Sequence, residues 1–255
     1  MALDFQGKRV LVTGAGSGIG KATAQKLSTL GATLILCDIN ADFLEAVKSA
    51  LEEDITQPKH IYQQYDVASS AACETVVSGL PNKDDGDTSQ KLDYLLNCAG
   101  INPTNIPITD TSDAYVTRLL DVNIRGTINM SRACVALLGR GSSIVNVSSN
   151  CGLRGYAGYT VYCATKHAIV GFTKALALEL GPKGIRVNAV APGPIDTPTM
   201  VGNVAGGDAN ERLKSGLALG RLGEAEEVAD VVAFLFSGQS SFVTGSVVEV
   251  TGGLK

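Results

Sequence analysis

The sequence predicts a single α/β domain, residues 1–255, built on a doubly wound parallel sheet of about seven strands with helices on both faces. Short apolar runs and helical patterns alternate from one end of the chain to the other, and the runs are apolar almost throughout. This alternation is typical of right-handed strand–helix–strand units, and continuously apolar strands are those covered on both faces. With 255 residues and 45% hydrophobic content, the chain is long enough to form one large core.

Each expected element follows from its local pattern. The strands are short apolar runs between turn signals, and in order they occupy residues 9–12, 33–37, 60–65, 92–97, 143–147, 185–190 and 247–250. The helices are the longer segments between them, with apolar residues at helical spacing, and they occupy residues 18–30, 41–53, 69–79, 112–138, 160–180 and 224–236. Sheets of this type bind ligands beyond the carboxyl ends of their strands, so functional residues are expected there.

Composition and charge exclude several classes of function. A formal net charge of −4 gives no electrostatic footprint for nucleic acid or for an anionic membrane. No apolar run reaches the roughly 20 residues that span a bilayer, and residues 1–8 lack the apolar core of a signal peptide. The six cysteines form no Cys-x-x-Cys pair, and two histidines are too few to build a zinc cluster with them. We therefore expect no bound metal, reduced thiols and a cytoplasmic location.

A glycine-rich turn joins the first expected strand to the first helix. Its glycines are Gly14, Gly18 and Gly20, spaced as Gly-x-x-x-Gly-x-Gly, with Ser17 and Ile19 between them. Glycines let the chain turn tightly and let a diphosphate approach the backbone, where N–H groups and the helix dipole hold its charge. All five residues are therefore predicted to contact a dinucleotide cofactor, although a purely structural turn is the alternative.

Asp38 follows the second expected strand. A carboxylate at this place can accept hydrogen bonds from both hydroxyls of an adenine ribose, and it would repel a 2′-phosphate. Neither Ile39, which comes next, nor Ser17 in the glycine turn offers a cation for such a phosphate. The charges therefore favour NAD over NADP as the cofactor, with Asp38 and Ile39 at the adenosine end. The alternative is that Asp38 only caps the following helix.

Two further strand ends carry residues suited to the same ligand. Asp66 and Val67 close the third expected strand, where a polar acceptor could face the adenine amino group. Asn97, Ala99 and Gly100 follow at the end of the fourth, where small residues let the backbone pass close to a ligand. These five residues complete the cofactor contacts predicted from strand ends.

Tyr162 and Lys166 stand four residues apart in a predicted helix, so their side chains share one face. A nearby ammonium favours the phenolate form of a tyrosine and lowers its pKa. The pair is therefore a candidate centre for moving a proton on or off an alcohol near neutral pH. The alternative is a chance surface pair, since such pairs are common on helices.

Together these motifs resemble the short-chain dehydrogenase/reductase family, in its compact single-domain branch with a Rossmann-type fold. The resemblance runs from the glycine turn to the Thr-Gly-Gly of residues 251–253. It implies a catalytic set made of Ser149, Tyr162, Lys166 and Asn123, and cofactor contacts near the nicotinamide from Pro192, Gly193, Ile195 and Thr197.

The resemblance implies a role for each catalytic residue. Tyr162 takes a proton from an alcohol or gives one to a ketone, while Lys166 binds the nicotinamide ribose and biases Tyr162 toward the phenolate. Ser149 stabilises charge on the substrate oxygen, and Asn123 holds a water that connects Lys166 to solvent. The alternatives are a turn cap for Ser149 and a buried structural amide for Asn123.

The expected function is hydride transfer between NAD(H) and a secondary alcohol or ketone, with the small-molecule substrate not specified. Alternatives are an NADPH-dependent carbonyl or 3-oxoacyl reductase and a non-catalytic NAD-sensing regulator. The substrate pocket is expected to draw on Ser149, Cys151, Tyr156, Tyr159 and Pro194, with Arg154 as the one nearby cation and a partly apolar lid at about residues 197–216. The family resemblance also implies a homo-oligomer, a tetramer or dimer, with helices 112–138 and 160–180 at an interface.

Overall fold

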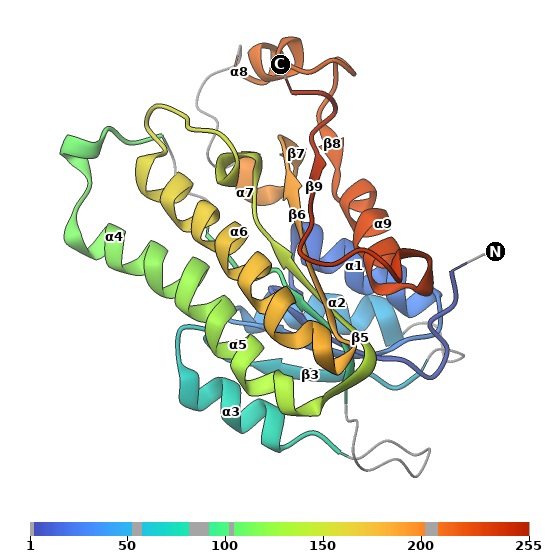
Figure 1. Ribbon diagram of the computed structural model, residues 1–255. Coiled ribbons are helices and arrows are strands. Elements are labelled where there is room, and N and C mark those ends of the chain that lie inside the picture. Colours follow the sequence, from blue (N-terminus) through green and yellow to red (C-terminus); the bar gives the residue numbers. More distant parts are fainter. Residues whose placement is uncertain (1–2, 53–57, 82–91, 102–104, 202–208, 255) are drawn as a thin grey trace.

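The computed structural model describes residues 3–52, 58–81, 92–101, 105–201 and 209–254. Its centre is a seven-stranded, fully parallel sheet in the order β3-β2-β1-β4-β5-β6-β9, which confirms the predicted fold class (Figure 1). The strands of this sheet are β1 (Arg9–Thr13), β2 (Thr33–Asp38), β3 (Ile61–Gln64), β4 (Leu92–Asn97), β5 (Leu138–Val147), β6 (Arg186–Pro192) and β9 (Val247–Val250). A separate short pair, β7 (Ile195–Asp196) and β8 (Gly223–Glu224), was not predicted.

Helices cover both faces of the sheet (Figure 1). One face carries α1 (Gly18–Thr29), α2 (Ala41–Glu52) and α9 (Ala225–Phe236), and the other carries α3 (Ser70–Ser78), α4 (Asp113–Leu120), α5 (Thr127–Cys134) and α6 (Thr160–Leu180). Two short helices, α7 (Pro198–Val201) and α8 (Ala209–Ser215), follow β7. No helix in the described part of the chain has the length and apolar content needed to cross a bilayer.

The core follows from the alternation of side chains along each strand. In β1, Val10 and Val12 belong to the apolar cluster that contains Leu27 of α1, whereas Leu11 belongs to the cluster that contains Met130 of α5. All five side chains are fully buried. Because successive residues of a strand point to opposite faces, a strand covered on both sides must be apolar throughout, as the sequence indicated.

The long helix predicted at residues 112–138 is interrupted. Between α4 and α5 the chain forms a π-helical segment, η2 (Asp121–Gly126), and β5 begins already at Leu138, after a 3-10 turn. The interruption lies where the helix meets the loop after β3, since a Cβ on Gly126 would come within 2.6 Å of a Val67 methyl group. π-Helical turns of this kind are frequent at functional sites, and η2 contains Asn123.

Strand order reverses between β1 and β4, and the two loops that leave these strands nearly touch. The hydroxyl of Thr13 accepts the backbone N–H groups of Cys98 and Ala99, each at 3.1 Å. A Cβ on Gly14, whose φ is +67°, would lie 2.8 Å from the Cα of Ala99. Only glycine fits such a close approach without strain. The fold thus forms the crevice at the switch point where open α/β sheets bind ligands.

Candidate active site

A cavity of about 550 Å³ lies at the carboxyl ends of β1, β2, β4, β5 and β6. Most of the residues singled out in the sequence line it, although they come from seven separate segments of the chain. They are Gly14, Ser17, Gly18, Ile19, Asp38, Ile39, Asp66, Val67, Ala99, Gly100, Ser149, Tyr162, Lys166, Pro192, Gly193, Ile195 and Thr197. The structure therefore brings the expected cofactor and catalytic residues to one site.

Three predicted site residues lie behind the cavity wall. Gly20 supports the glycine turn, because a Cβ there would overlap the carbonyl oxygen of Gly14. Asn97 is buried, and its amide nitrogen donates to the hydroxyl of Ser131 at 2.9 Å and to Oδ1 of Asn146 at 2.8 Å. These contacts tie the Asn97 side chain to α5 and β5, and Asn97 does not line the cavity.

Asn123 is the third of these residues and is 1% exposed. Its Oδ1 accepts the N–H of Ile101 at 2.8 Å, and its Nδ2 donates to the carbonyl of Ile101 at 3.0 Å. It therefore ties the π-helical segment to the chain after β4. A Cβ on Gly100 would lie 3.3 Å from Asn123 Oδ1 and 3.5 Å from Lys166 Nζ, so the amide and the ammonium flank one point of the backbone.

The glycine turn has the geometry of an anion site. Helix α1 opens at Gly18, and the side chain of its N-cap residue, Ser17, forms no capping hydrogen bond. The first N–H groups of a helix have no partner within the helix, so here they can meet a diphosphate, and the helix dipole favours its charge. These residues fit the phosphates of a nicotinamide dinucleotide.

Asp38 is held in place at the end of β2. Its Oδ2 accepts the N–H of Gly16 at 2.8 Å, and its Oδ1 accepts the N–H of Asn40 at 2.9 Å. At the start of α2 it is Asn40 whose Oδ1 accepts the N–H of Phe43, at 3.0 Å. The carboxylate is thus positioned by the glycine turn, with its remaining lone pairs available to ribose hydroxyls.

Tyr162 and Lys166 are both buried on α6, and Lys166 Nζ lies 5.7 Å from the centre of the Tyr162 ring. The ammonium donates to the carbonyl of Val147 at 2.9 Å. Burial lowers the pKa of Lys166 to about 8. Burial also raises the pKa of Tyr162, with the Cys151 thiol adding to this and the Ser149 hydroxyl opposing it.

The prediction that Lys166 lowers the pKa of Tyr162 below its ordinary value is therefore wrong. The cost of removing a phenolate from water exceeds the effect of nearby polar groups, so the phenol form is favoured. Ser149, in turn, both lines the cavity and caps a turn, because its Oγ accepts the N–H of Cys151 at 3.2 Å. Ser149 can therefore cap this turn and also face a substrate, so the two roles predicted for it are compatible.

The pKa of Lys166 gives a testable pH dependence of stability. Its value of about 8 in the folded protein is below the usual 10.5, so between these values the unfolded chain binds more protons. This group therefore makes the free energy of unfolding rise with pH in that window. We expect Lys166→Met to remove the rise, as measured by urea unfolding of both proteins at about pH 8, 9 and 10. A difference between the two proteins that does not change with pH would contradict the prediction.

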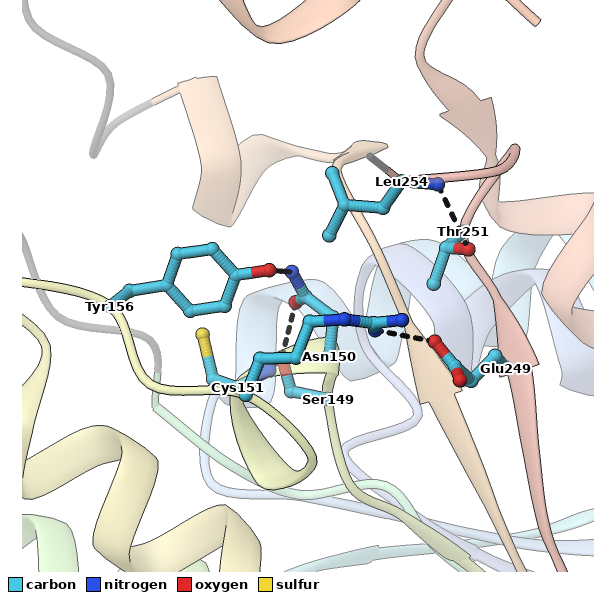
Figure 2. Close-up of polar contacts among 8 residues, drawn as sticks. Ser149, Asn150, Cys151, Tyr156, Glu249, Thr251 and Leu254 are labelled. Atoms are coloured by element: carbon cyan, nitrogen blue, oxygen red, sulfur yellow. Dashed lines mark hydrogen bonds and ion pairs between the residues drawn. The ribbon is translucent and has the colours of Figure 1, made fainter. Parts of the chain in front are cut away.

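The sequence did not identify several residues that line the cavity. They include Phe43, Arg118, Val122 and Asn150. Phe43 stands four residues after Ile39, and in the structure both large apolar side chains are left exposed, Phe43 at 50% and Ile39 at 59%. Among the described side chains, Arg118 lines the cavity and Arg154 does not. Arg154 instead pairs at 2.5 Å with Glu249, whose carboxylate is labelled in Figure 2.

The pocket residues expected from the sequence, Cys151, Tyr156, Tyr159 and Pro194, all line the cavity. Thr197, Met200 and Leu213 from the predicted lid do so as well, whereas residues 202–208, including Val204, lie outside the described residues. Within the described part of the chain, no group of three or more His, Cys, Asp or Glu side chains is placed to hold a metal ion.

The fold and this cavity define an oxidoreductase of the dinucleotide-dependent class. The chain belongs to the short-chain dehydrogenase/reductase family, since the family model described as Enoyl-(Acyl carrier protein) reductase matches residues 14–255. It is 37% identical over 258 residues to short-chain dehydrogenase/reductase aba4 of Botryotinia fuckeliana (strain B05.10), covering 98% of this chain and 97% of that protein.

Two solved structures extend the comparison to the cofactor. A short-chain dehydrogenase from Burkholderia cenocepacia J2315 in complex with NADP superposes with a TM-score of 0.87 at 33% identity, covering 98% of each chain. A 3-oxoacyl-[acyl-carrier protein] reductase from Brucella melitensis with bound NAD superposes with a TM-score of 0.82 at 35% identity, covering 99% of this chain and 94% of that one. The family membership therefore supports NAD(P) dependence, while relatives differ in which of the two dinucleotides they hold.

Proposed function

We propose that this protein transfers a hydride between NAD(H) and a secondary alcohol or ketone, with Tyr162 as the general acid and base. The observation that carries the proposal is one cavity lined by Asp38, the glycine turn, Ser149, Tyr162 and Lys166. Interconversion of an alcohol and a ketone moves a hydride and a proton, and this cavity combines cofactor-binding groups with a proton-transfer pair.

A bound nicotinamide dinucleotide supplies or accepts the hydride at the substrate carbon. In reduction, Tyr162 gives its phenol proton to the ketone oxygen; in oxidation, its phenolate takes the proton of the alcohol. Ser149 donates a hydrogen bond to the same oxygen and stabilises the negative charge that develops there. Lys166 binds the ribose hydroxyls beside the ring, and Asn123 holds the backbone that Lys166 packs against. Burial raises the pKa of Tyr162, so the phenol, the form that donates the proton in reduction, is the resting form of the side chain.

The choice of NAD rests on Asp38. The N–H groups of Gly16 and Asn40 hold the Asp38 carboxylate at the cavity, so it cannot readily turn away from the 2′-phosphate of NADP. The negative charges of the carboxylate and the phosphate would then repel each other. NADPH-dependent reduction of a carbonyl or 3-oxoacyl substrate is the second candidate, supported by the NADP complex and the 3-oxoacyl reductase among the related structures. A non-catalytic NAD sensor is disfavoured, because Tyr162, Lys166 and Ser149 all line the cavity.

The proposal is tested by a substrate screen with the purified protein. Absorbance of NADH and of NADPH is followed with a panel of ketones, and absorbance of NADH is followed in the reverse direction with alcohols and NAD. We expect turnover in both directions and a larger kcat/KM with NADH. Tight NADH binding without turnover of any compound would favour the sensor, and a strong preference for NADPH would refute the argument from Asp38.

We also propose a homo-oligomer, a tetramer or dimer, in a reducing cytoplasmic compartment. Large apolar side chains are exposed on the outer helices, with Leu178 on α6 at 81%, Leu120 on α4 at 41% and Ile128 on α5 at 37%. The described structure also holds all six cysteines as free thiols. Light scattering of the purified protein is expected to give two or four times the mass of 26.4 kDa, and a monomer would contradict the proposal.

A further inference from the structure

Phe43 presents a large apolar side chain at the end of the cavity that holds Asp38. It stands in the first turn of α2, and both Phe43 and Ile39 line the cavity while remaining half exposed or more. A single apolar residue on a protein surface needs no explanation, but neighbouring ones in the wall of a cavity indicate a place that a ligand covers. The sequence assigned Ile39 to the adenosine end of a dinucleotide and did not identify Phe43.

The backbone and Cβ atom of Phe43 are fixed beside the Asp38 carboxylate. Gly16 packs against both residues, since a Cβ on Gly16 would lie 2.8 Å from Phe43 Cβ and 2.9 Å from Asp38 Oδ2. On the other side, Asp38 Oδ1 accepts the N–H of Asn40 at 2.9 Å, and Asn40 Oδ1 accepts the N–H of Phe43 at 3.0 Å. Rotation about the Cα–Cβ bond of Phe43 moves the ring but leaves Cβ against the glycine turn. The phenyl group therefore stays close to the carboxylate.

This corner of the cavity offers little to a phosphate group. Among the described residues that line the cavity, the cations are Arg118 on α4 and Lys166 on α6, and neither belongs to the glycine turn, β2 or α2. A phenyl ring has no hydrogen-bond donor, so a phosphate that it covers loses water without gaining a partner. A 2′-phosphate beside Asp38 would thus meet an apolar ring as well as a carboxylate.

We propose that Phe43 is a second specificity-determining residue for NAD(H), which disfavours a 2′-phosphate by desolvation and independently of the charge on Asp38. The inference rests on the proposed function and deepens its choice of cofactor. The adenine ribose of NAD carries a neutral 2′-hydroxyl, which costs less to cover than a phosphate. Asp38 and Phe43 thus act through different physical effects, electrostatic repulsion and loss of hydration, so each should act when the other is removed.

Binding of NADH and NADPH tests this inference without turnover, because the two dinucleotides differ only in the 2′-phosphate. Both dissociation constants are measured from the fluorescence of the bound cofactor, for the wild type and for Phe43→Ala. This substitution removes the ring but keeps the Cβ atom that meets Gly16. We expect it to lower the ratio of the Kd for NADPH to the Kd for NADH about tenfold, the effect of relieving one polar group of burial without a partner.

Two control variants accompany this measurement. Phe242→Ala removes the same ring from a fully exposed position outside the cavity lining, and it should leave the ratio at its wild-type value. Phe43→Leu keeps an apolar side chain at the same place and should retain most of the wild-type ratio. Circular dichroism of each variant checks that the fold is retained.

The independence of the two residues needs the Asp38→Asn background. There we expect Phe43→Ala to lower the ratio by about the same factor again, since additive free energies are the sign of independent effects. A change seen only with Asp38 in place would show that the ring merely positions the carboxylate, and it would overturn the inference. An unchanged ratio in Phe43→Ala would also overturn it, while leaving the proposed function intact. If the wild type bound NADPH as tightly as NADH, the choice of NAD would fail and the inference with it.

Discussion

Replacing Tyr162 by phenylalanine should lower kcat by about 10²- to 10⁴-fold, the range that general acid–base groups contribute. The change removes the hydroxyl and keeps the aromatic ring, which is 8% exposed and packs with Cys151, Cys163 and Leu119. The ring also keeps its place beside Lys166 Nζ. The fold and the cofactor contacts are therefore expected to survive while the proton donor is lost.

The measurement pairs turnover with cofactor binding. Ketone reduction by Tyr162→Phe is followed by NADH absorbance, and NADH affinity is followed by the fluorescence of the bound cofactor. Tyr115→Phe serves as the control, since it makes the same chemical change in the same apolar cluster but outside the cavity lining. Turnover within a few fold of the wild type would exclude Tyr162 as the acid. A parallel loss of NADH binding would mean that the hydroxyl supports the cofactor and not the chemistry.

The fold was predictable because its signals are local. Most strands of the main sheet contain an apolar run that the sequence shows directly. Val10, Leu11 and Val12 are all buried because helices cover both faces of β1. Once the strands are in order, the rule that ligands bind at their carboxyl ends places Asp38 and the glycine turn at one site without any knowledge of side-chain contacts. The cofactor end of the candidate site could therefore be predicted from turn residues and strand order, whereas Ser149, Asn123 and the contacts at residues 192–197 came from the family resemblance.

What could not be predicted depends on contacts between distant segments. The π-helical turn at Asp121–Gly126 occurs where Gly126 meets Val67, and no local pattern reports that approach. Asn97 ends a strand as expected, but its side chain is hydrogen-bonded to Ser131 and Asn146 and does not line the cavity.

The charge state of the acid/base pair could not be predicted for a related reason. Helical spacing puts Tyr162 and Lys166 on one face, yet it says nothing of burial. Desolvation is the largest influence on both groups, and it moves each toward its neutral form, lowering the pKa of Lys166 and raising that of Tyr162. A sequence shows which groups are neighbours along a helix, whereas the surrounding packing decides which physical effect is the larger.

Neutralising Asp38 should weaken the preference for NADH over NADPH. Asp38→Asn keeps the size of the side chain and one acceptor oxygen but removes the negative charge. We expect kcat/KM to rise with NADPH and to fall with NADH, changing their ratio by roughly ten- to a hundredfold, since like charges in contact cost a few kcal/mol and each tenfold corresponds to about 1.4 kcal/mol. Steady-state kinetics with both cofactors and one ketone measures the ratio.

The control is Asp42→Asn, which removes the same charge from an exposed position in the first turn of α2, outside the cavity lining. If general surface charge governed the preference, both variants would shift the ratio equally, and the specific role of Asp38 would be refuted. The structure favours a local effect for a steric reason as well. A Cβ on Gly16 would lie 2.8 Å from the Cβ of Phe43 and 2.9 Å from Asp38 Oδ2, so the glycine turn, the carboxylate and the phenylalanine already crowd one another. Removing the charge leaves this crowding in place, and the NADPH rate should therefore rise without reaching the wild-type rate with NADH.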